Sequence, residues 1–318
     1  MCTAITYCGS DHYFGRNLDL EYHYDEATVI TPRKYMFPFE KKPGYSLVGI
    51  ATVADGYPLY YDAMNEMGLG VAGLNFPDNA WYFPGKPGKN AVAPHDFIPW
   101  VLRRFSSVNE AVEGIQKIKI VDVPFGNFPQ STLHWILCDK DRAVTVEQTK
   151  SGMHLYQNPV GVLSNNPAFP YHMTNLANYM HLQTSQPGNT LCPDVPLPYY
   201  SRGMGAMGLP GDLSSGSRFI RAVFTRQNAQ RYENEVQAVG QCFHILGAVK
   251  QTAGCISHNG HLEKTVYTSC CNLDKGIYYY TTYENSQITG VHLYHEDLDG
   301  SNLISYPLCF GQQIRMEN

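Results

Sequence analysis

The second residue of the chain, Cys2, has a type and a position that could support chemistry. A buried cysteine most often packs as a small apolar side chain. If Met1 is removed, however, Cys2 carries both a thiol and a free α-amine. An ordinary thiol has a pKa of about 8.5 and an α-amine one of about 7.7–8.0, so the amine can take the thiol proton near neutral pH without a histidine. Cys2 is therefore a candidate nucleophile that brings its own general base.

Two charged residues follow on the next expected strand. The segments CTAITYC and YFGRNLDL, joined by GSDH, predict a β-hairpin. A turn centred between residues 9 and 12 places Cys2 opposite Asp19, whose carboxylate could hold an α-ammonium group. Arg16 would then point to the other face of a flat strand, so a site shared by all three residues requires a bulge at 15–17. The ordinary alternatives are a solvated or turn-forming Asp and an Arg on a wet face.

Three polar residues farther along the chain could complete a site. Arg218, in GDLSSGSRFIRAVF, falls in the expected first turn of a helix, where the helix dipole disfavours a cation. It therefore needs a partner, either in a site or in an ion pair with a loop carboxylate such as Asp212. Asn75, in VAGLNFP, and Asn165, in VLSNNPAF, both lie where a strand meets a proline-containing corner. Asn is common in turns, but its amide can also donate to an oxyanion.

The other clusters of potentially reactive or ligand-binding residues do not indicate a metal or cofactor site. The histidine pairs of HNGH (258–261) and HLYH (292–295) have no cysteine or carboxylate at ligand spacing, so we expect no metal site. Cys270 and Cys271 are adjacent on an expected strand and are predicted to pack in the core. RGMGAMGLPG does not follow a strand, as a dinucleotide-binding loop must. We therefore expect neither a metal nor an organic cofactor.

Composition limits the class of protein. The 318 residues include 23 Lys and Arg against 28 Asp and Glu, and no basic run stands out, so we expect no nucleic-acid partner. No apolar run is long enough to predict a membrane span, and the first twenty residues lack the pattern of a signal peptide. Nine cysteines, an odd number at irregular spacings, favour reduced thiols. These features predict a cytoplasmic protein without a membrane partner.

The expected elements must position these residues. Strand segments cluster with strand segments and helical segments with helical ones, which predicts an α+β fold of antiparallel sheets covered by helix pairs rather than a parallel βαβ repeat. No linker resembles a domain boundary, so 1–318 is expected to form a single domain. The Gly-, Pro- and Ser-rich stretch at 182–214 is too long for an ordinary connection. We expect it to be functional or to pack on another subunit.

Several long motifs resemble one known family. MCTAI, FGRNLDLEY, MNEMGLGVAGLNFP, VLSNNPAF, NLANY and GLPGDLSSGSRFIRA occur in the order found in the choloylglycine hydrolases. These are the bile salt hydrolases and penicillin V acylases of the N-terminal-nucleophile hydrolase superfamily. The resemblance covers essentially the whole chain. It implies a four-layer αββα sandwich, a homotetramer, and a mature chain that starts at Cys2.

The resemblance also implies roles for the candidate residues. Cys2 corresponds to the nucleophile, Arg16 and Asp19 to its immediate partners, and Asn165 to an oxyanion donor. Arg218 corresponds to the second arginine of the site. The remaining position is Asn75, whose backbone N–H would be the other oxyanion donor and whose counterpart tends to be Asn in bile salt hydrolases and Tyr in penicillin acylases.

The expected function is hydrolysis of the amide that joins a bile acid to glycine or taurine. A steroid acyl group needs a broad apolar pocket near Cys2, and we expect its lining to include Leu18, Leu20, Phe125 and Phe128, although each could equally be an ordinary core residue. The first alternative is an acylase for penicillin V or another N-acyl compound. The second is a binding protein on this fold that has no catalytic activity and keeps Met1.

Overall fold

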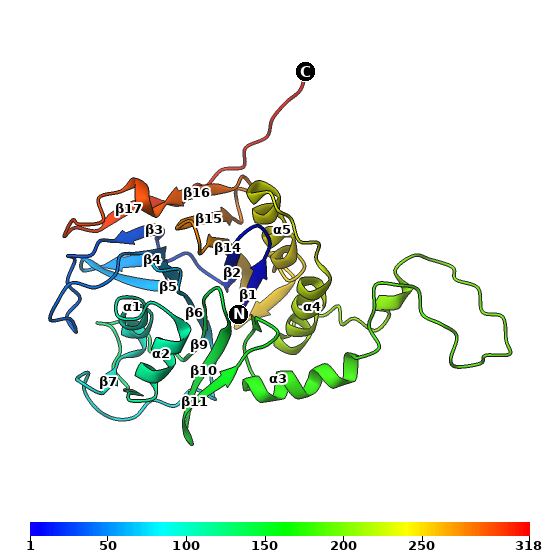
Figure 1. Ribbon diagram of the computed structural model, residues 1–318, viewed down its shortest axis with the longest axis horizontal. Helices are drawn as coiled ribbons and strands as arrows, with labels where there is room; N and C mark the ends of the chain where they lie inside the picture. Colours follow the sequence, from blue (N-terminus) through cyan, green and yellow to red (C-terminus); the bar gives the residue numbers. More distant parts are fainter.

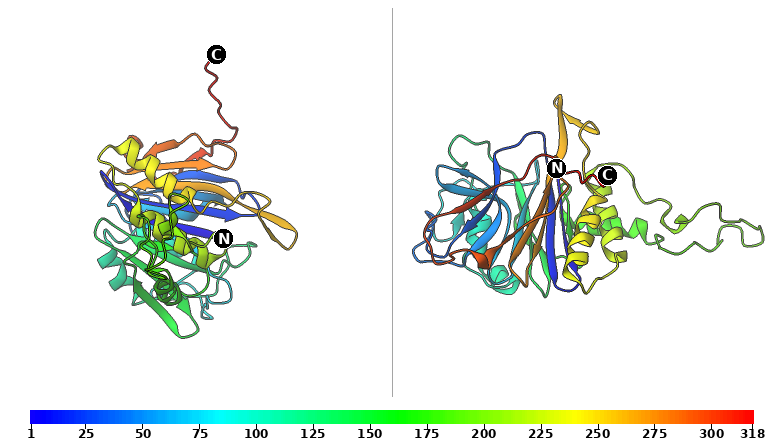
Figure 2. Two further views of the ribbon diagram at one scale, coloured as in Figure 1. Left: turned by 90° about the vertical axis from the view of Figure 1, so that its right-hand side faces the viewer. Right: turned by 90° about the horizontal axis from the view of Figure 1, so that it is seen from above.

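Two antiparallel sheets lie face to face between two layers of helices in the computed structural model, which describes residues 1–318 (Figure 1). The α+β architecture expected from the sequence, a four-layer αββα sandwich, is confirmed. Viewed from above, the helices α4 and α5 flank the sheets on one side, and the chain around α1 and α2 lies on the other (Figure 2).

The first sheet carries the start of the chain. Its strands follow the order β12-β1-β2-β14-β15-β16, with β13 paired to the outer part of β14. Their bounds are β1 Cys2–Cys8, β2 His12–Leu20, β12 Val162–Leu163, β13 Ile256–His258, β14 His261–Asn272, β15 Ile277–Thr282 and β16 Thr289–His292. The hairpin of β13 and β14 projects from the body of the molecule (Figure 2).

The second sheet has eight strands in the order β11-β10-β9-β6-β5-β4-β3-β17. Their bounds are β3 Glu26–Thr31, β4 Leu47–Ala54, β5 Tyr57–Asn65, β6 Gly70–Asn75, β9 Leu133–Cys138, β10 Ala143–Thr149, β11 Gly152–Gln157 and β17 Ile304–Pro307. A separate short pair consists of β7 Ala91–Val92 and β8 Lys119–Ile120. The outer strands β3, β4 and β17 were not among the strands that the sequence predicted.

Helices cover the outer face of each sheet. They are α1 Phe97–Leu102, α2 Val108–Ile115, α3 Phe169–Asn175, α4 Ser215–Asn228 and α5 Glu235–Gly247, with short 3₁₀ turns at Pro94–Asp96, Leu176–Tyr179, Met204–Ala206 and Leu293–His295. None of them is long and apolar enough to cross a membrane.

The alternation of side chains along the strands divides the core in two. On β9, Ile136 and Cys138 belong to the core shared by the two sheets and by α4 and α5. Trp135 and Leu137 belong instead to the core beneath α1 and α2. Alternate side chains of each strand therefore point toward the other sheet, and a polar side chain at such a position is buried between the two sheets.

The register of the first hairpin differs from the prediction by one residue. Its turn contains only residues 9–11, so Cys2 lies opposite Leu18, and Met1 lies opposite Asp19 through a bond from the Asp19 N–H to the Met1 carbonyl at 2.9 Å. A shift of one residue exchanges the two faces of a strand. Cys2 therefore shares a face with Arg16, and Asp19 points to the other face. No bulge occurs at 15–17.

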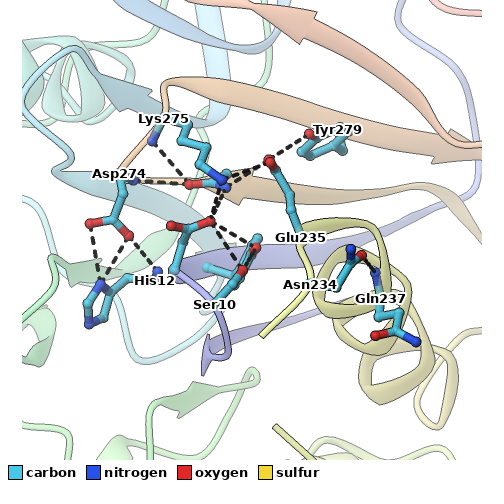
Figure 3. Close-up of polar contacts among 11 residues, drawn as sticks. Ser10, His12, Asn234, Glu235, Gln237, Asp274, Lys275 and Tyr279 are labelled. Carbon is cyan, nitrogen blue, oxygen red and sulfur yellow. Dashed lines mark hydrogen bonds and ion pairs between the residues drawn. The ribbon is translucent and has the colours of Figure 1, made fainter. Parts of the chain in front are cut away.

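The tip of this hairpin is held by a network of polar contacts, which Figure 3 shows. Lys275, in the β14–β15 turn, lies 3.0 Å from Asp11 and 2.9 Å from Glu235, the first residue of α5. His12 contacts Asp274 of the same turn through both its backbone N–H and its ring. These contacts tie β1 and β2 to two neighbouring elements at the end of the hairpin remote from Cys2.

The segment at 182–214 extends away from the body between α3 and α4 (Figure 1). Its bonds, such as that from the Gln183 N–H to the Gly205 carbonyl at 2.9 Å, run mostly within the segment itself. Several of its large apolar side chains face solvent, with Leu191 86% and Tyr200 81% exposed. We call residues 182–214 the arm.

Candidate active site

Cys2 begins β1, and its side chain points into the space between the sheets, where the residue is only 2% exposed. Arg16, on the adjacent β2, donates from Nη2 to Cys2 Sγ at 2.6 Å. Its other terminal nitrogen donates to the carbonyl oxygens of Tyr61 at 2.9 Å and Gly73 at 2.8 Å. The guanidinium group thus bridges the two sheets and ends at the sulfur, where a positive charge favours the thiolate.

Irregularities in the second sheet make these carbonyls available. The register of β5 against β4 shifts at Tyr61, which is the extra residue of a β-bulge. Beside it, β6 pairs with β5 only as far as Ala72, whereas its pairing with β9 continues to Asn75. The carbonyls of Tyr61 and Gly73 are therefore free to accept from Arg16 in place of a neighbouring strand.

Asp62 supplies a buried negative charge near Arg16. Its carboxylate accepts hydrogen bonds from the hydroxyls of Tyr267 at 2.5 Å, Tyr278 at 2.7 Å and Ser269 at 2.9 Å. Burial raises the pKa of Asp62, while Arg16 and the three hydroxyls act to lower it. Burial also acts to lower the pKa of Arg16, but the charges of Cys2 and Asp62 raise it above the ordinary value. Arg16 therefore stays charged.

Asn165 follows β12 and touches Cys2 from the other side. Its side-chain oxygen accepts from the Cys2 backbone nitrogen at 2.8 Å and from Arg218 Nη2 at 2.7 Å. Two donors on one atom identify that atom as the oxygen. The amide nitrogen donates to the carbonyl of Asn75 at 2.7 Å, which leaves its second hydrogen for another acceptor.

Arg218 lies in the first turn of α4, as predicted, and its partner is the start of β1. Nη1 donates to the Cys2 carbonyl and to the Thr3 hydroxyl, both at 2.5 Å. The alternative ion pair with Asp212 is absent, because that carboxylate binds the Ser214 N–H and the Ser217 hydroxyl instead. Burial lowers the pKa of Arg218, and the negative charges of Asp19 and Cys2 oppose this shift.

Asp19 lies on the opposite face of β2, beside the start of the chain. The amino group of Met1 donates to the Asp19 carbonyl oxygen at 2.6 Å and to Glu263 Oε1 at 2.9 Å. One carboxylate oxygen of Asp19 accepts from the Thr265 hydroxyl at 2.6 Å, while the other is buried without a partner. Burial raises the pKa of Asp19, against the lowering effects of Arg218 and the amino terminus.

A cavity of about 440 Å³ opens beside Cys2 and Arg16. The structure places four residues in the wall of this cavity that the sequence suggested for an acyl pocket: Leu18, Leu20, Phe125 and Phe128. Asn75 is also in its wall, whereas Asp19, Asn165 and Arg218 are not among its lining residues; the Asn165 amide reaches the edge of the cavity through its bond to the Asn75 carbonyl. Further apolar lining comes from Leu59, Tyr60, Tyr61, Ile98, Val123 and Leu133.

A larger cleft, of about 1510 Å³, lies over α1 and does not reach Cys2. We place the chemistry in the smaller cavity, because it contains the thiol. Neither region holds a group of three or more His, Cys, Asp or Glu side chains that could bind a metal ion. Cys270 and Cys271 are buried in the core, as predicted.

Two carboxylates near the site were not predicted from the sequence. Asp62 stands in the otherwise apolar and aromatic strand YPLYYDAMN, and a lone charge on such a strand is a signal that could have indicated it. Glu263, which binds the Met1 amino group, lies on the projecting β13–β14 hairpin. Nothing in the sequence around Glu263 indicates that it reaches the first residue of the chain.

A match to a known protein family agrees with the geometry of the site. A sequence model described as linear amide C–N hydrolases, choloylglycine hydrolase family, matches residues 2–306. The chain belongs to the choloylglycine hydrolase family. As a member of that family it is a hydrolase that acts on linear amide bonds.

Two relatives of this choloylglycine hydrolase cover nearly its whole length. It is 51% identical to the bile salt hydrolase/transferase of Lactiplantibacillus plantarum, over 97% of each chain. It is 38% identical to the bile salt hydrolase/transferase of Clostridium perfringens, over 96% of each chain.

Solved structures agree with this fold. A variant of the conjugated bile acid hydrolase from Clostridium perfringens superposes with a TM-score of 0.92 at 37% identity, over 100% of both chains. Penicillin V acylase from Agrobacterium tumefaciens has a TM-score of 0.76 at 20% identity, over 98% of this chain and 94% of that one, which shows a shared fold.

Proposed function

We propose that this protein is a bile salt hydrolase, which cleaves the amide bond between a bile acid and glycine or taurine. The observation that carries the proposal is the Cys2 thiol, bonded to Arg16 and set beside a cavity with a largely apolar lining. A cavity of about 440 Å³ falls within the usual range of small-ligand sites. The names of the full-length relatives support a conjugated bile acid as the substrate.

The proposed reaction begins once Met1 is removed. The Cys2 nitrogen, now a neutral α-amine, stays within reach of the Asn165 side-chain oxygen and carries one more hydrogen than the amide did, which can turn toward the unpartnered oxygen of Asp19. The amine takes the thiol proton, and Arg16 stabilises the thiolate that results. Asp19 orients the ammonium group, and Arg218 holds the Cys2 carbonyl in place.

The sulfur then attacks the amide carbon, and the carbonyl oxygen becomes an oxyanion. The second amide hydrogen of Asn165 and the backbone N–H of Asn75 would donate to it, and the loss of one such donor costs roughly 10²–10³ in rate. The C–N bond breaks as the α-ammonium gives its proton to the departing amine. Water next adds to the thioester and releases the bile acid, and the proton it loses returns to Cys2. None of these steps uses a metal or an organic cofactor.

Two alternatives stay open to test. A penicillin V acylase would use the same chemistry on a smaller acyl group, and the likeness to such an enzyme extends to the fold. A binding protein without catalytic activity would keep Met1, whose amino group is held here by Asp19 and Glu263. Asn75, in place of the Tyr expected in penicillin acylases, favours the bile salt.

A parallel assay separates these functions. Purified protein is given glycocholate, taurocholate and penicillin V at equal concentrations, and the released amine is measured. We expect much higher kcat/KM for the two bile salts than for penicillin V. Preferred cleavage of penicillin V would establish the acylase, and tight binding of bile salts with no released amine would establish the binding protein.

We also propose the partners of the enzyme, its oligomeric state and its cellular compartment. Conjugated bile acids are the small-molecule partners, and the arm joins copies of the chain in a homotetramer. We place the enzyme in the cytoplasm, where its nine cysteines stay as the free thiols seen in the structure.

A further inference from the structure

A buried polar pair that the proposed chemistry does not use lies behind the two asparagines. His134, on β9, and Glu147, on β10, are fully buried, and His134 Nδ1 lies 3.0 Å from Glu147 Oε1. The second ring nitrogen, Nε2, lies 2.8 Å from the carbonyl oxygen of Ser164. Since Ser164 directly precedes Asn165, the imidazole contacts the backbone that carries this asparagine.

The same ring also touches the chain beside the other asparagine. The faces of His134 and Phe76 stack with their centroids 4.3 Å apart and their planes 5° apart. Phe76 directly follows Asn75, whose carbonyl accepts from the Asn165 amide. A single imidazole is thus in contact with the neighbours of both Asn75 and Asn165.

The contacts of His134 determine where its hydrogens lie. A carbonyl oxygen only accepts, so Nε2 must carry a hydrogen to bond Ser164. Nδ1 faces the Oε1 atom of Glu147, which also accepts from the Phe169 N–H at 2.9 Å. Another proton must therefore lie between Nδ1 and Oε1, on one or the other. Glu147 thus lets the ring keep a hydrogen on Nε2.

One further titratable group faces this pair. His172, on α3, lies with Nε2 2.9 Å from the carbonyl oxygen of Asn165. Burial lowers its pKa, and because a carbonyl oxygen only accepts, its Nε2 carries the hydrogen of this bond. The two successive carbonyls, of Ser164 and Asn165, therefore each accept a hydrogen bond from a buried imidazole.

We propose that His134, oriented by Glu147, is a positioning residue that fixes the distance between Asn75 and Asn165 and so aligns the two oxyanion donors. This inference rests on the proposed function, which assigns the oxyanion to these asparagines. The pair satisfies the Ser164 carbonyl and the Phe169 N–H, but stability alone does not require titratable side chains here, because apolar replacements of buried charged pairs are often neutral or stabilising. The next interior position on β9 is the apolar Ile136.

Glu147→Gln tests the proposal. A glutamine oxygen that accepts from the Phe169 N–H also takes the hydrogen of Nδ1, which leaves a neutral His134 with none on Nε2. If the amide is reversed, its NH₂ group donates to Nδ1 and faces the Phe169 N–H, which then has no acceptor. The first orientation therefore loses the bond from His134 to Ser164, and the second loses the bond from Phe169. A lower pH supplies the ring with a second proton and restores the bond to Ser164.

The expected result is a loss of kcat with glycocholate of about tenfold to a hundredfold near pH 7.5, with KM almost unchanged. The ratio of the kcat of the variant to that of the wild type should then rise as the pH is lowered toward about 5. A purely structural role would lower thermal stability without moving this ratio. An unchanged kcat, or a loss that is equal at every pH, overturns the proposal.

Glu40→Gln is the matched control. Glu40 accepts from Arg103 Nε at 2.9 Å in a buried ion pair that lies outside the cavity of Cys2. The Glu40→Gln variant should have a lower thermal stability than the wild type but the same kcat and the same pH profile.

A second measurement does not depend on turnover or on the stability of a variant. In the ¹⁵N spectrum of the wild-type histidines, His134 should carry a hydrogen on Nε2 throughout the range from about pH 5 to 8. A ring protonated only on Nδ1 overturns the proposal. Wild-type protein that does not hydrolyse glycocholate would overturn the proposed function instead, and the spectrum would still test the hydrogen on His134.

Discussion

At the scale of single residues, the site balances two buried arginines against buried acidic groups. Arg16 has Cys2 at its end and Asp62 nearby, while Arg218 has Asp19 and the Cys2 carbonyl. An unpaired charge between two sheets would be costly, so each arginine needs its counter-charge to stay in place. This balance lets a cation lie beside the thiol without contact with water.

Asp62→Asn should therefore lower the free energy of unfolding by about 3 kcal/mol, because it removes the buried negative charge that faces Arg16. Urea denaturation measures this change. Tyr278→Phe, which removes one hydrogen bond to Asp62, is the control and should cost only about 1 kcal/mol. An Asp62→Asn protein as stable as the wild type would show that Arg16 does not depend on this carboxylate.

Asn75→Tyr should change which acyl groups fit, because the Asn75 side chain lies in the cavity wall and its proposed role in the chemistry uses only its backbone N–H. We expect kcat/KM to fall more for steroid amides than for phenoxyacetyl amides, since a rigid ring would occupy the space of the steroid. Parallel kinetics with glycocholate and penicillin V measure the difference. An equal loss on both would assign Asn75 to the shared chemistry, and no change on either would place it outside the site.

At the scale of elements, the sequence predicted the first hairpin, the clustering of helices and strands, and the layers. It did not predict the register, because the turn has three residues where four were expected, and a single residue decides whether Cys2 faces Arg16 or Asp19. Asp62 and His134 were also missed. Asp62 reaches Arg16 from the opposite sheet, and His134 acts through the backbone at Ser164. Contacts between segments so far apart in the sequence leave no local pattern.

Gly15→Ala tests the close approach of β2 and β14 next to Arg16. A Cβ at Gly15 would lie 2.3 Å from the carbonyl oxygen of Ser269, so one of the two strands must shift. We expect a loss of about 1–3 kcal/mol in the free energy of unfolding and a lower kcat, because Arg16 would move with β2. Calorimetry and kinetics measure both.

The control for this substitution is Gly240→Ala on α5, where an added Cβ meets nothing within 4 Å. It should stabilise the protein by about 0.5–1 kcal/mol, through helix propensity, without changing kcat. If Gly15→Ala behaved in the same way, the spacing of β2 and β14 would have no part in positioning Arg16.

At the scale of the whole molecule, the arm is the feature that a single chain leaves unexplained. Its exposed Leu191, Leu197, Tyr199 and Tyr200 have no partner on the body of the protein, and large apolar surfaces of this kind usually mark a protein–protein contact. The proposed homotetramer would cover them.

Sedimentation equilibrium should therefore give about four times the chain mass of 35.7 kDa at micromolar concentration. The double variant Leu191→Ser, Tyr200→Ser should give a smaller mass, because it removes the two most exposed apolar side chains of the arm. Val236→Ser, which removes an exposed apolar side chain on α5, is the control and should keep the mass of the wild type. A stable wild-type monomer at micromolar concentration would contradict the assignment of the arm to subunit contacts.

The N-terminal cysteine mechanism is tested most directly by trapping the acyl-enzyme. The protein is mixed with taurocholate, quenched in acid within the first turnovers and digested, and the N-terminal peptide is analysed by mass spectrometry. We expect a peptide that begins at Cys2, with a free α-amine and a cholyl thioester on the sulfur. We expect no adduct in Cys2→Ser, whose turnover should fall by about a thousandfold or more. Active enzyme that retains Met1, or a cholyl group on any other residue, would contradict this mechanism.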